Sequence, residues 1–256
     1  MSTNLGKFVW FDQMSNDLSG SEAFYRAVIG WDIAPNTMNA QTYSTLSAGG
    51  IPVGGLMPIP DDAKATGVKP AWMGYIGVND VDAYADKVTA AGGTIHRPPT
   101  DIPNVGRFAV ATDPQGVGFI LFKGNTDAAP ATDPTKPGNF CWRELHTSDA
   151  SAAFDFYEKL FGWGRGQEMD MDAEGLYRVF TFDGAMAGGI MNKMAHEPTS
   201  YWVYYIAVEA ADTAAARVLA AGGKVLAGPL QVPGGQWMVF SSDPQGATFG
   251  MLAPKR

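Results

Sequence analysis

Residues 8–31, FVWFDQMSNDLSGSEAFYRAVIGW, return in altered form as residues 140–163, FCWRELHTSDASAAFDFYEKLFGW. Both stretches keep Phe-x-Trp near the start, Phe-Tyr in the middle and Gly-Trp at the end. Repeated spacing reveals architecture before any single residue is interpreted. Three more motifs recur in the same order: Gly54-Gly55-Leu56-Met57 as Gly188-Gly189-Ile190-Met191, Ala90-Ala91-Gly92-Gly93 as Ala220-Ala221-Gly222-Gly223, and Asp113-Pro114-Gln115-Gly116 as Asp243-Pro244-Gln245-Gly246. The chain is therefore predicted to hold two diverged copies of one module.

A segment without apolar periodicity separates the copies. It contains Pro130, Pro134 and Pro137 among small and acidic residues, which is typical of an extended linker. We therefore expect a first domain over residues 1–124, a linker over 125–137 and a second domain over 138–256.

Each copy has the pattern strand, helix and further strands, twice over, which predicts an α+β fold built from paired βαβββ units. In the first copy we expect strands at 7–14, 42–48, 51–58, 72–78, 94–96, 107–112 and 117–122. Ser19 and Glu22 fit a capping box at the start of the first helix, and Asp80 is expected to cap the second.

Glycines and tryptophans mark the ends of these elements. Gly30 and Gly162 are expected to end helices in the left-handed conformation, and Trp31 and Trp163 are interpreted as packing anchors behind them. The Gly-Gly pairs are expected to serve turns and caps: 49–50, 54–55, 92–93, 188–189 and 222–223.

Composition narrows the classes of partner. The formal charge of −8 disfavours nucleic-acid binding, which depends on Lys and Arg displacing counterions. No apolar run approaches the roughly 18 residues of a membrane span, and the start of the chain lacks the features of a signal peptide. We expect a cytoplasmic protein, in which the single Cys141 is a small core residue.

The order and recurrence of these motifs resemble the vicinal oxygen chelate superfamily, which includes glyoxalases, bleomycin-resistance proteins and extradiol dioxygenases. The resemblance covers residues 7–123 and 139–253. It implies curved mixed sheets around a cavity that binds a small molecule, with the dimer-like pairing of modules made inside one chain or between two chains.

The resemblance also implies where a metal would bind in metal-dependent members. These positions fall on the first strand of each unit and on the last strand of the second, and in this chain they hold Trp10, Trp142, Met73, Val203, Ile120 and Gly250. None of these side chains suits a hard divalent metal. We therefore predict no metal and no other cofactor.

The two-residue period of a strand places Trp142, Glu144 and His146 on one face, matched in the first copy by Trp10, Asp12 and Met14. A carboxylate two residues beyond a Trp in both copies is a candidate general base. Asp12, Glu144 and His146 are therefore candidate catalytic residues. The alternative is that the carboxylates accept structural hydrogen bonds and that His146 is an ordinary strand-end residue.

Three kinds of residue are candidates for binding a ligand. Trp10 and Trp142 would supply aromatic surface, and Tyr75 and Tyr205 match across the copies and would stack on a ligand, although both tyrosines could equally be core. Arg107 could bind an anion, or it could form a surface ion pair.

These residues leave two hypotheses from different classes open. One is a lyase, isomerase or oxygenase-type enzyme, either metal-independent or with an atypical metal site, that acts on a small oxygenated molecule. The other is a protein that sequesters a drug or metabolite without catalysis. A structural role with filled cavities is a third possibility.

Overall fold

The computed structural model describes residues 4–38, 41–126, 132–171 and 175–256. The first copy contains β1 (Phe8–Ser15), α1 (Leu18–Val28), β2 (Asp32–Met38), β3 (Gln41–Ala48), β4 (Ile51–Pro58), α2 (Asp61–Ala65), β5 (Ala71–Gly77), α3 (Val81–Ala90), β6 (Thr94–Ile102), β7 (Gly106–Thr112) and β8 (Gly118–Gly124). The second contains β9 (Phe140–Thr147), α4 (Ala150–Phe161), β10 (Gly164–Asp170), β11 (Leu176–Phe182), β12 (Ala185–Asn192), β13 (Tyr201–Ala207), α5 (Ala211–Ala220), β14 (Lys224–Gln231), β15 (Trp237–Ser242) and β16 (Thr248–Ala253). Within these ranges, no helix has the length and apolar character needed to cross a membrane.

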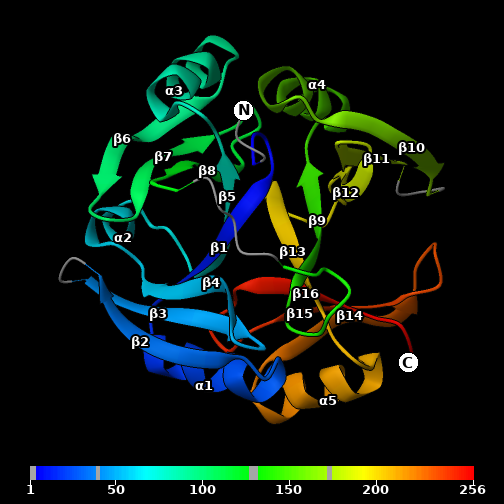
Figure 1. Ribbon diagram of the computed structural model, residues 1–256. Helices are drawn as coiled ribbons and strands as arrows, with labels where there is room; N and C mark the ends of the chain where they lie inside the picture. The colour runs from blue at the N-terminus through cyan, green and yellow to red at the C-terminus, as the bar shows by residue number, and fades with distance from the viewer. Residues whose placement is uncertain (1–3, 39–40, 127–131, 172–174) are drawn as a thin grey trace. The chain divides into compact units, whose positions relative to one another are not determined.

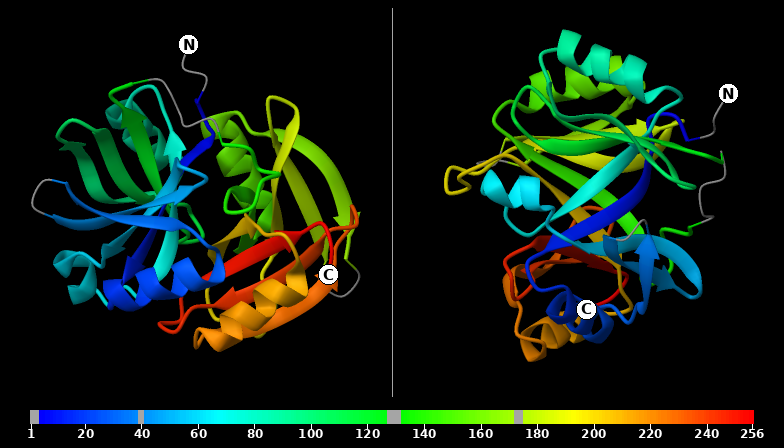
Figure 2. Two further views of the ribbon diagram at one scale, coloured as in Figure 1. Left: turned by 60° about the horizontal axis from the view of Figure 1, so that its bottom comes forward. Right: turned by 90° about the vertical axis from the view of Figure 1, so that its left-hand side faces the viewer.

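Each copy of the repeat forms one eight-stranded sheet. The strand orders are β2-β3-β4-β1-β5-β8-β7-β6 and β10-β11-β12-β9-β13-β16-β15-β14. Within each sheet, parallel pairs such as β5–β8 and β12–β9 combine with antiparallel hairpins such as β7–β8 and β10–β11. The strands are curved, as β10 and β11 show in Figure 2. The predicted α+β class, with two tandem pairs of βαβββ units, is confirmed.

The packing divides the chain into two compact units that differ from the two sequence copies. One unit comprises residues 1–10, 73–129 and 143–203, and the other comprises 11–72, 130–142 and 204–256. Each unit therefore takes one βαβββ half from each copy. In the first unit α3 contacts α4, and in the second α1 contacts α5 (Figure 1). The predicted linker, 125–137, lies partly outside the described residues.

The helix ends show which capping predictions hold. Gly30 and Gly162 have φ of 84° and 72°, and the Asp80 side chain accepts a hydrogen bond from the Ala83 N–H, as predicted. The predicted capping box is wrong. Asp17 is the N-cap of α1 and accepts from the Gly20 N–H, because its carboxylate stands one residue before the first turn, where those amides are free.

Ser19 and Glu22, the two members of that predicted box, make other contacts. The Ser19 hydroxyl donates to Asp17 Oδ1, 2.9 Å away. Glu22 instead accepts a 2.5 Å hydrogen bond from the Ser44 hydroxyl on β3. A distant strand therefore supplies the partner that the local pattern assigned to the helix start.

Strand β2 and the short helix α2 were not predicted. Pro35 interrupts the apolar pattern of β2 and lacks an amide hydrogen, which argues against a central strand. The strand lies at the edge of its sheet, where a missing donor is tolerated. Strand β6 is also longer than the predicted 94–96.

The two tryptophans that follow the helix-ending glycines are packing anchors, as predicted. Trp31 and Trp163 are each 2% exposed. Their indole N–H groups donate to the carbonyl oxygens of Gly138 and Gly6, each at 2.7 Å. The buried donor of each ring is therefore satisfied by backbone.

The Asp-Pro-Gln-Gly turns join the two copies inside each compact unit. The Tyr157 hydroxyl, on α4, donates to Asp113 Oδ2 at 3.0 Å, and the Tyr25 hydroxyl, on α1, donates to Asp243 Oδ2 at 3.1 Å. Burial raises the pKa of both aspartates despite these hydrogen bonds. A turn in one copy is thereby connected to the first helix of the other.

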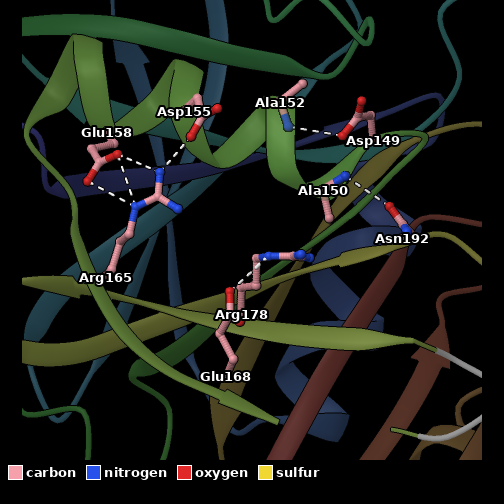
Figure 3. A network of polar contacts seen from close by, with 9 residues as sticks. All are labelled: Asp149, Ala150, Ala152, Asp155, Glu158, Arg165, Glu168, Arg178 and Asn192. Carbon is pink, nitrogen blue, oxygen red and sulfur yellow. Dashed lines mark hydrogen bonds and ion pairs between the residues drawn. The ribbon is translucent and has the colours of Figure 1, made fainter. Parts of the chain in front are cut away.

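Polar contacts connect α4 to β10 and β12, two strands of the second sheet (Figure 3). Asp149 caps α4 by accepting from the Ala152 N–H, and Asn192, at the end of β12, accepts from the Ala150 N–H at 2.9 Å. Arg165 on β10 pairs with Asp155 and Glu158 of the helix. The helix start is therefore connected directly to β12, the neighbour of β9.

Candidate functional site

Strand β9 places the Glu144 and His146 side chains together. His146 Nε2 lies 2.9 Å from Glu144 Oε1. The His146 side chain is 12% exposed and the Glu144 side chain 15% exposed, so both keep some contact with solvent. The two-residue spacing on one strand face, recognised in the sequence, thus produces a carboxylate–imidazole pair.

A tyrosine from a neighbouring hairpin donates a hydrogen bond to the other oxygen of this carboxylate. The Tyr177 hydroxyl, on β11, donates to Glu144 Oε2 at 2.8 Å. Gly189 on β12 is paired with Glu144 across the parallel ladder, and a Cβ atom there would overlap the Tyr177 ring. The glycine therefore leaves the space in which the phenol lies.

The first copy repeats this arrangement in the other compact unit. The Tyr43 hydroxyl donates to Asp12 Oδ1 at 2.7 Å, Gly55 is paired with Asp12, and a Cβ on Gly55 would overlap the Tyr43 hydroxyl. The prediction that the pairs 54–55 and 188–189 serve turns and caps is wrong, because both lie inside strands and make room for a tyrosine. For the pairs 49–50, 92–93 and 222–223, the predicted role in turns and caps is confirmed, because Gly49, Gly50, Gly92 and Gly222 have positive φ.

In the second copy, a further glutamate and a further tyrosine contact the His146 ring. His146 Nδ1 lies 3.0 Å from Glu197 Oε1, in the loop between β12 and β13. The Tyr201 hydroxyl donates a short hydrogen bond to the same Glu197 oxygen, and its ring stacks on the His146 ring with centroids 4.9 Å apart. Met14 stands in the place of His146 in the first copy. We call Glu144, His146, Tyr177, Glu197 and Tyr201 the Glu144–His146 cluster.

The electrostatics of the cluster favour a protonated imidazole. Burial acts to lower the pKa of His146, but the hydrogen bonds and charges of Glu144 and Glu197 outweigh it, so this pKa is raised above 6.5. Burial acts to raise the pKa of Glu197, but Tyr201, His146 and the Met194 N–H together hold it below 4.5. Burial and the neighbouring Glu197 raise the pKa of Tyr201.

These shifts predict how His146 contributes to stability at different pH. The His146 pKa is higher in the folded state, so the ion pairs contribute fully below the unfolded pKa of about 6.5 and are lost as pH rises through the folded pKa. The difference in unfolding free energy between wild type and His146→Gln should therefore be larger at about pH 5.5 than at about pH 9. Urea titrations at the two pH values measure it, and an equal difference at both would contradict a protonated His146.

The proposed ligand-binding residues take several positions. Trp10 and Trp142 are half-buried, whereas Tyr75 and Tyr205 are 8% and 4% exposed and lie in the core. Arg107 donates to Asp82 and Asp101 at 2.7–2.9 Å, the surface ion pair that the sequence left open. Ligand binding by these residues stays a prediction.

The residues at the family's metal positions do not fit a metal. Gly250 has no side chain, and the ring of Tyr205, its partner in the β13–β16 ladder, covers the space where a side chain would begin. Ile120 is likewise paired with Tyr75. In the part of the chain that the structure describes, no group of three or more His, Cys, Asp or Glu residues is arranged to hold a metal ion.

Four residues of these arrangements were missed in the sequence. Tyr43 and Tyr177 could have been found, because they occupy equivalent positions before the repeated Gly-Gly motifs. Glu197 and Tyr201 carry no such signal, because the first copy has no equivalent and their partner His146 is far away in the sequence.

Comparisons with known proteins identify the family. The model described as "Glyoxalase/Bleomycin resistance protein/Dioxygenase superfamily" matches residues 7–121 and 142–251. The chain is 36% identical over 247 residues to "Putative glyoxylase CFP32" of Mycobacterium tuberculosis, covering 96% of this chain and 94% of that protein. It is 29% identical over 261 residues to "Anthracycline biosynthesis protein DnrV" of Streptomyces peucetius, with 96% and 93% covered.

Solved structures share the fold at low sequence identity. The Mn(II)-bound glyoxalase from Novosphingobium aromaticivorans superimposes with a TM-score of 0.68 at 15% identity, covering 98% of this chain and 83% of that one. The 2,2',3-trihydroxybiphenyl 1,2-dioxygenase from Sphingomonas wittichii gives 0.67 at 14% identity, with 99% and 91% covered. With the family model matched over both copies, the chain belongs to the glyoxalase/bleomycin resistance protein/dioxygenase superfamily.

Proposed function

We propose that this protein binds a small, uncharged, oxygenated organic molecule at the Glu144–His146 cluster and moves a proton on it without a metal, as a lyase or isomerase does. The observation that carries the proposal is the imidazole of His146 joined to the carboxylate–tyrosine pair of the second copy; the first copy has such a pair without the imidazole. A positioned carboxylate next to an imidazole is a common arrangement for general acid–base catalysis.

The charge balance of the cluster supports an uncharged ligand. Glu144 and Glu197 both lie against His146, and their carboxylates disfavour a carboxylate or phosphate ligand brought close to them. Arg107, the cation considered for an anionic ligand, is already paired with Asp82 and Asp101. The names of the relatives, a glyoxylase and an anthracycline biosynthesis protein, are compatible with carbonyl compounds and with aromatic ligands.

The chemistry follows from the base and the donors beside it. Glu144 takes a proton from a carbon next to a carbonyl group, and the electron pair of the broken C–H bond moves to form an enolate. The Tyr177 hydroxyl, beside the carboxylate, supplies a hydrogen-bond donor for the oxygen anion. Return of the proton to another carbon completes an isomerisation, and loss of a leaving group from the enolate completes an elimination.

Hydrogen–deuterium exchange tests this function without knowledge of the product. Neutral oxygenated aromatic ketones that raise the melting temperature are incubated with protein in D₂O, and deuterium beside the carbonyl is measured by mass spectrometry. Glu144→Gln should slow enzyme-dependent exchange by about 100-fold or more. The ketone concentration that gives half of the maximal rise in melting temperature should change by no more than a few-fold, because the amide keeps the size of the carboxylate.

Asp12→Asn is the matched control, since Asp12 has the same tyrosine contact but Met14 in place of histidine. It should leave the exchange rate nearly unchanged. Undiminished exchange in Glu144→Gln would remove the role of Glu144 as base.

Sequestration without catalysis is the second candidate function. It is favoured by the saturation of the cluster, in which both His146 nitrogens and both Glu144 oxygens already have partners. Ketones that bind the wild-type protein but show no enzyme-dependent exchange would support sequestration and contradict proton transfer.

A further inference from the structure

We propose that Glu197 is a positioning residue, which accepts the Nδ1–H of His146 and keeps the proton on that nitrogen while Nε2 faces Glu144. The proposal rests on the proposed function for its catalytic consequence, although the orientation of the ring is measurable without any substrate.

The geometry around His146 carries the proposal. An imidazole ring pointing from a strand is free to flip or rotate unless its second nitrogen is held. Here Nδ1 faces the Glu197 carboxylate at 3.0 Å while Nε2 faces Glu144 at 2.9 Å. Tyr201 stacks on the ring at an interplanar angle of 22°, so its plane is fixed as well.

Glu197 is itself firmly held. One carboxylate oxygen accepts a 2.6 Å hydrogen bond from the Met194 N–H, and the other accepts from the Tyr201 hydroxyl. The Lys193 ammonium group donates to the Glu197 carbonyl oxygen at 2.6 Å, and the side chain is only 11% exposed. A loop residue with this many contacts is suited to holding another side chain in place.

The polar groups that face the ring come from three elements and one loop. Glu144 lies on β9 with His146, Tyr177 on β11 contacts Glu144, Tyr201 begins β13, and Glu197 and Lys193 lie in the loop after β12. Glu197 is the carboxylate that faces Nδ1, whereas Glu144 faces Nε2. Removing the charge of Glu197 alone should therefore change the state of Nδ1 and leave the Nε2 contact.

Nitrogen NMR of the full chain tests this positioning. The sequence has three histidines, and the His146 signals are assigned by their loss in His146→Gln. In Glu197→Gln the His146 pKa should fall, and the neutral ring should carry its proton on Nε2. In Glu197→Asp, which keeps the charge, the His146 pKa should fall less than in Glu197→Gln. Glu209→Gln, which removes an equal charge at an exposed position, should leave both unchanged.

An unchanged His146 pKa and tautomer in folded Glu197→Gln would overturn the proposal. The deuterium-exchange assay then separates the two claims. If Glu197→Gln changes the pKa and tautomer of His146 and also lowers kcat about 10- to 100-fold with little change in KM, the positioning role and the proposed function both stand. If His146 is altered but Glu144→Gln still exchanges normally, the positioning stands and the proposed function fails.

Discussion

Replacing Trp163 with alanine is expected to lower the free energy of unfolding by about 3–5 kcal/mol, the usual cost of deleting a large buried aromatic side chain. The indole is 2% exposed. It stacks on Phe180 with centroids 4.3 Å apart and on Tyr157 at 4.7 Å, and its N–H donates to the Gly6 carbonyl oxygen. Truncation leaves a cavity among rigid rings and an unsatisfied buried carbonyl.

Urea denaturation followed by circular dichroism measures this loss. Trp237→Ala is the control, because this tryptophan on β15 is only half-buried and lies against the Arg256 guanidinium at 5.5 Å. It should cost less than about 1.5 kcal/mol. Equal losses in the two variants would mean that Trp163 is not the anchor described here.

Replacing Gly189 with alanine is expected to displace Tyr177 and break its hydrogen bond to Glu144. The added Cβ would overlap the phenol ring, and overpacking of this kind costs about 1–3 kcal/mol. The exchange activity proposed above should fall together with stability, since the carboxylate loses its donor. Melting temperature and deuterium exchange, measured on the same sample, report the two effects.

Gly118→Ala is the matched control for this substitution. Gly118 also lies in a strand, but its Cβ would meet the flexible end of Met73, at 3.1 Å from Cε, which can move aside. Gly189→Ala should cost less stability in a Tyr177→Ala background than in the wild type, because the obstructing ring is gone. An equal loss in Gly118→Ala and Gly189→Ala would show that the overlap with Tyr177 does not matter.

The candidate site was predictable where two residues share one strand. Glu144 and His146 lie two positions apart on β9, and the period of the strand is enough to bring them together. Asp12 was found in the same way and makes the equivalent tyrosine contact. The tyrosines themselves come from neighbouring hairpins, so their contacts depend on strand pairing and register, which no local pattern specifies.

Tyr205 illustrates a limit of reasoning from residue type alone. Matching it to Tyr75 across the copies was straightforward, but the sequence could not decide between ligand contact and core. The absence of a side chain on Gly250, opposite Tyr205 in the ladder, lets the ring lie over that strand. Because residue 250 is a glycine, the Tyr205 ring lies in the space where a side chain at this position would begin.

The sequence by itself determined the duplication, the βαβββ pattern, the helix ends at Gly30 and Gly162, and the face shared by Glu144 and His146, because each depends on spacing along a short stretch of chain. Only the tertiary structure decided that each compact unit joins halves of both copies, and that Glu197 and Tyr201 enclose His146. Such contacts arise where distant segments pack against each other, and their energy depends on strand pairing and close fit rather than on local periodicity.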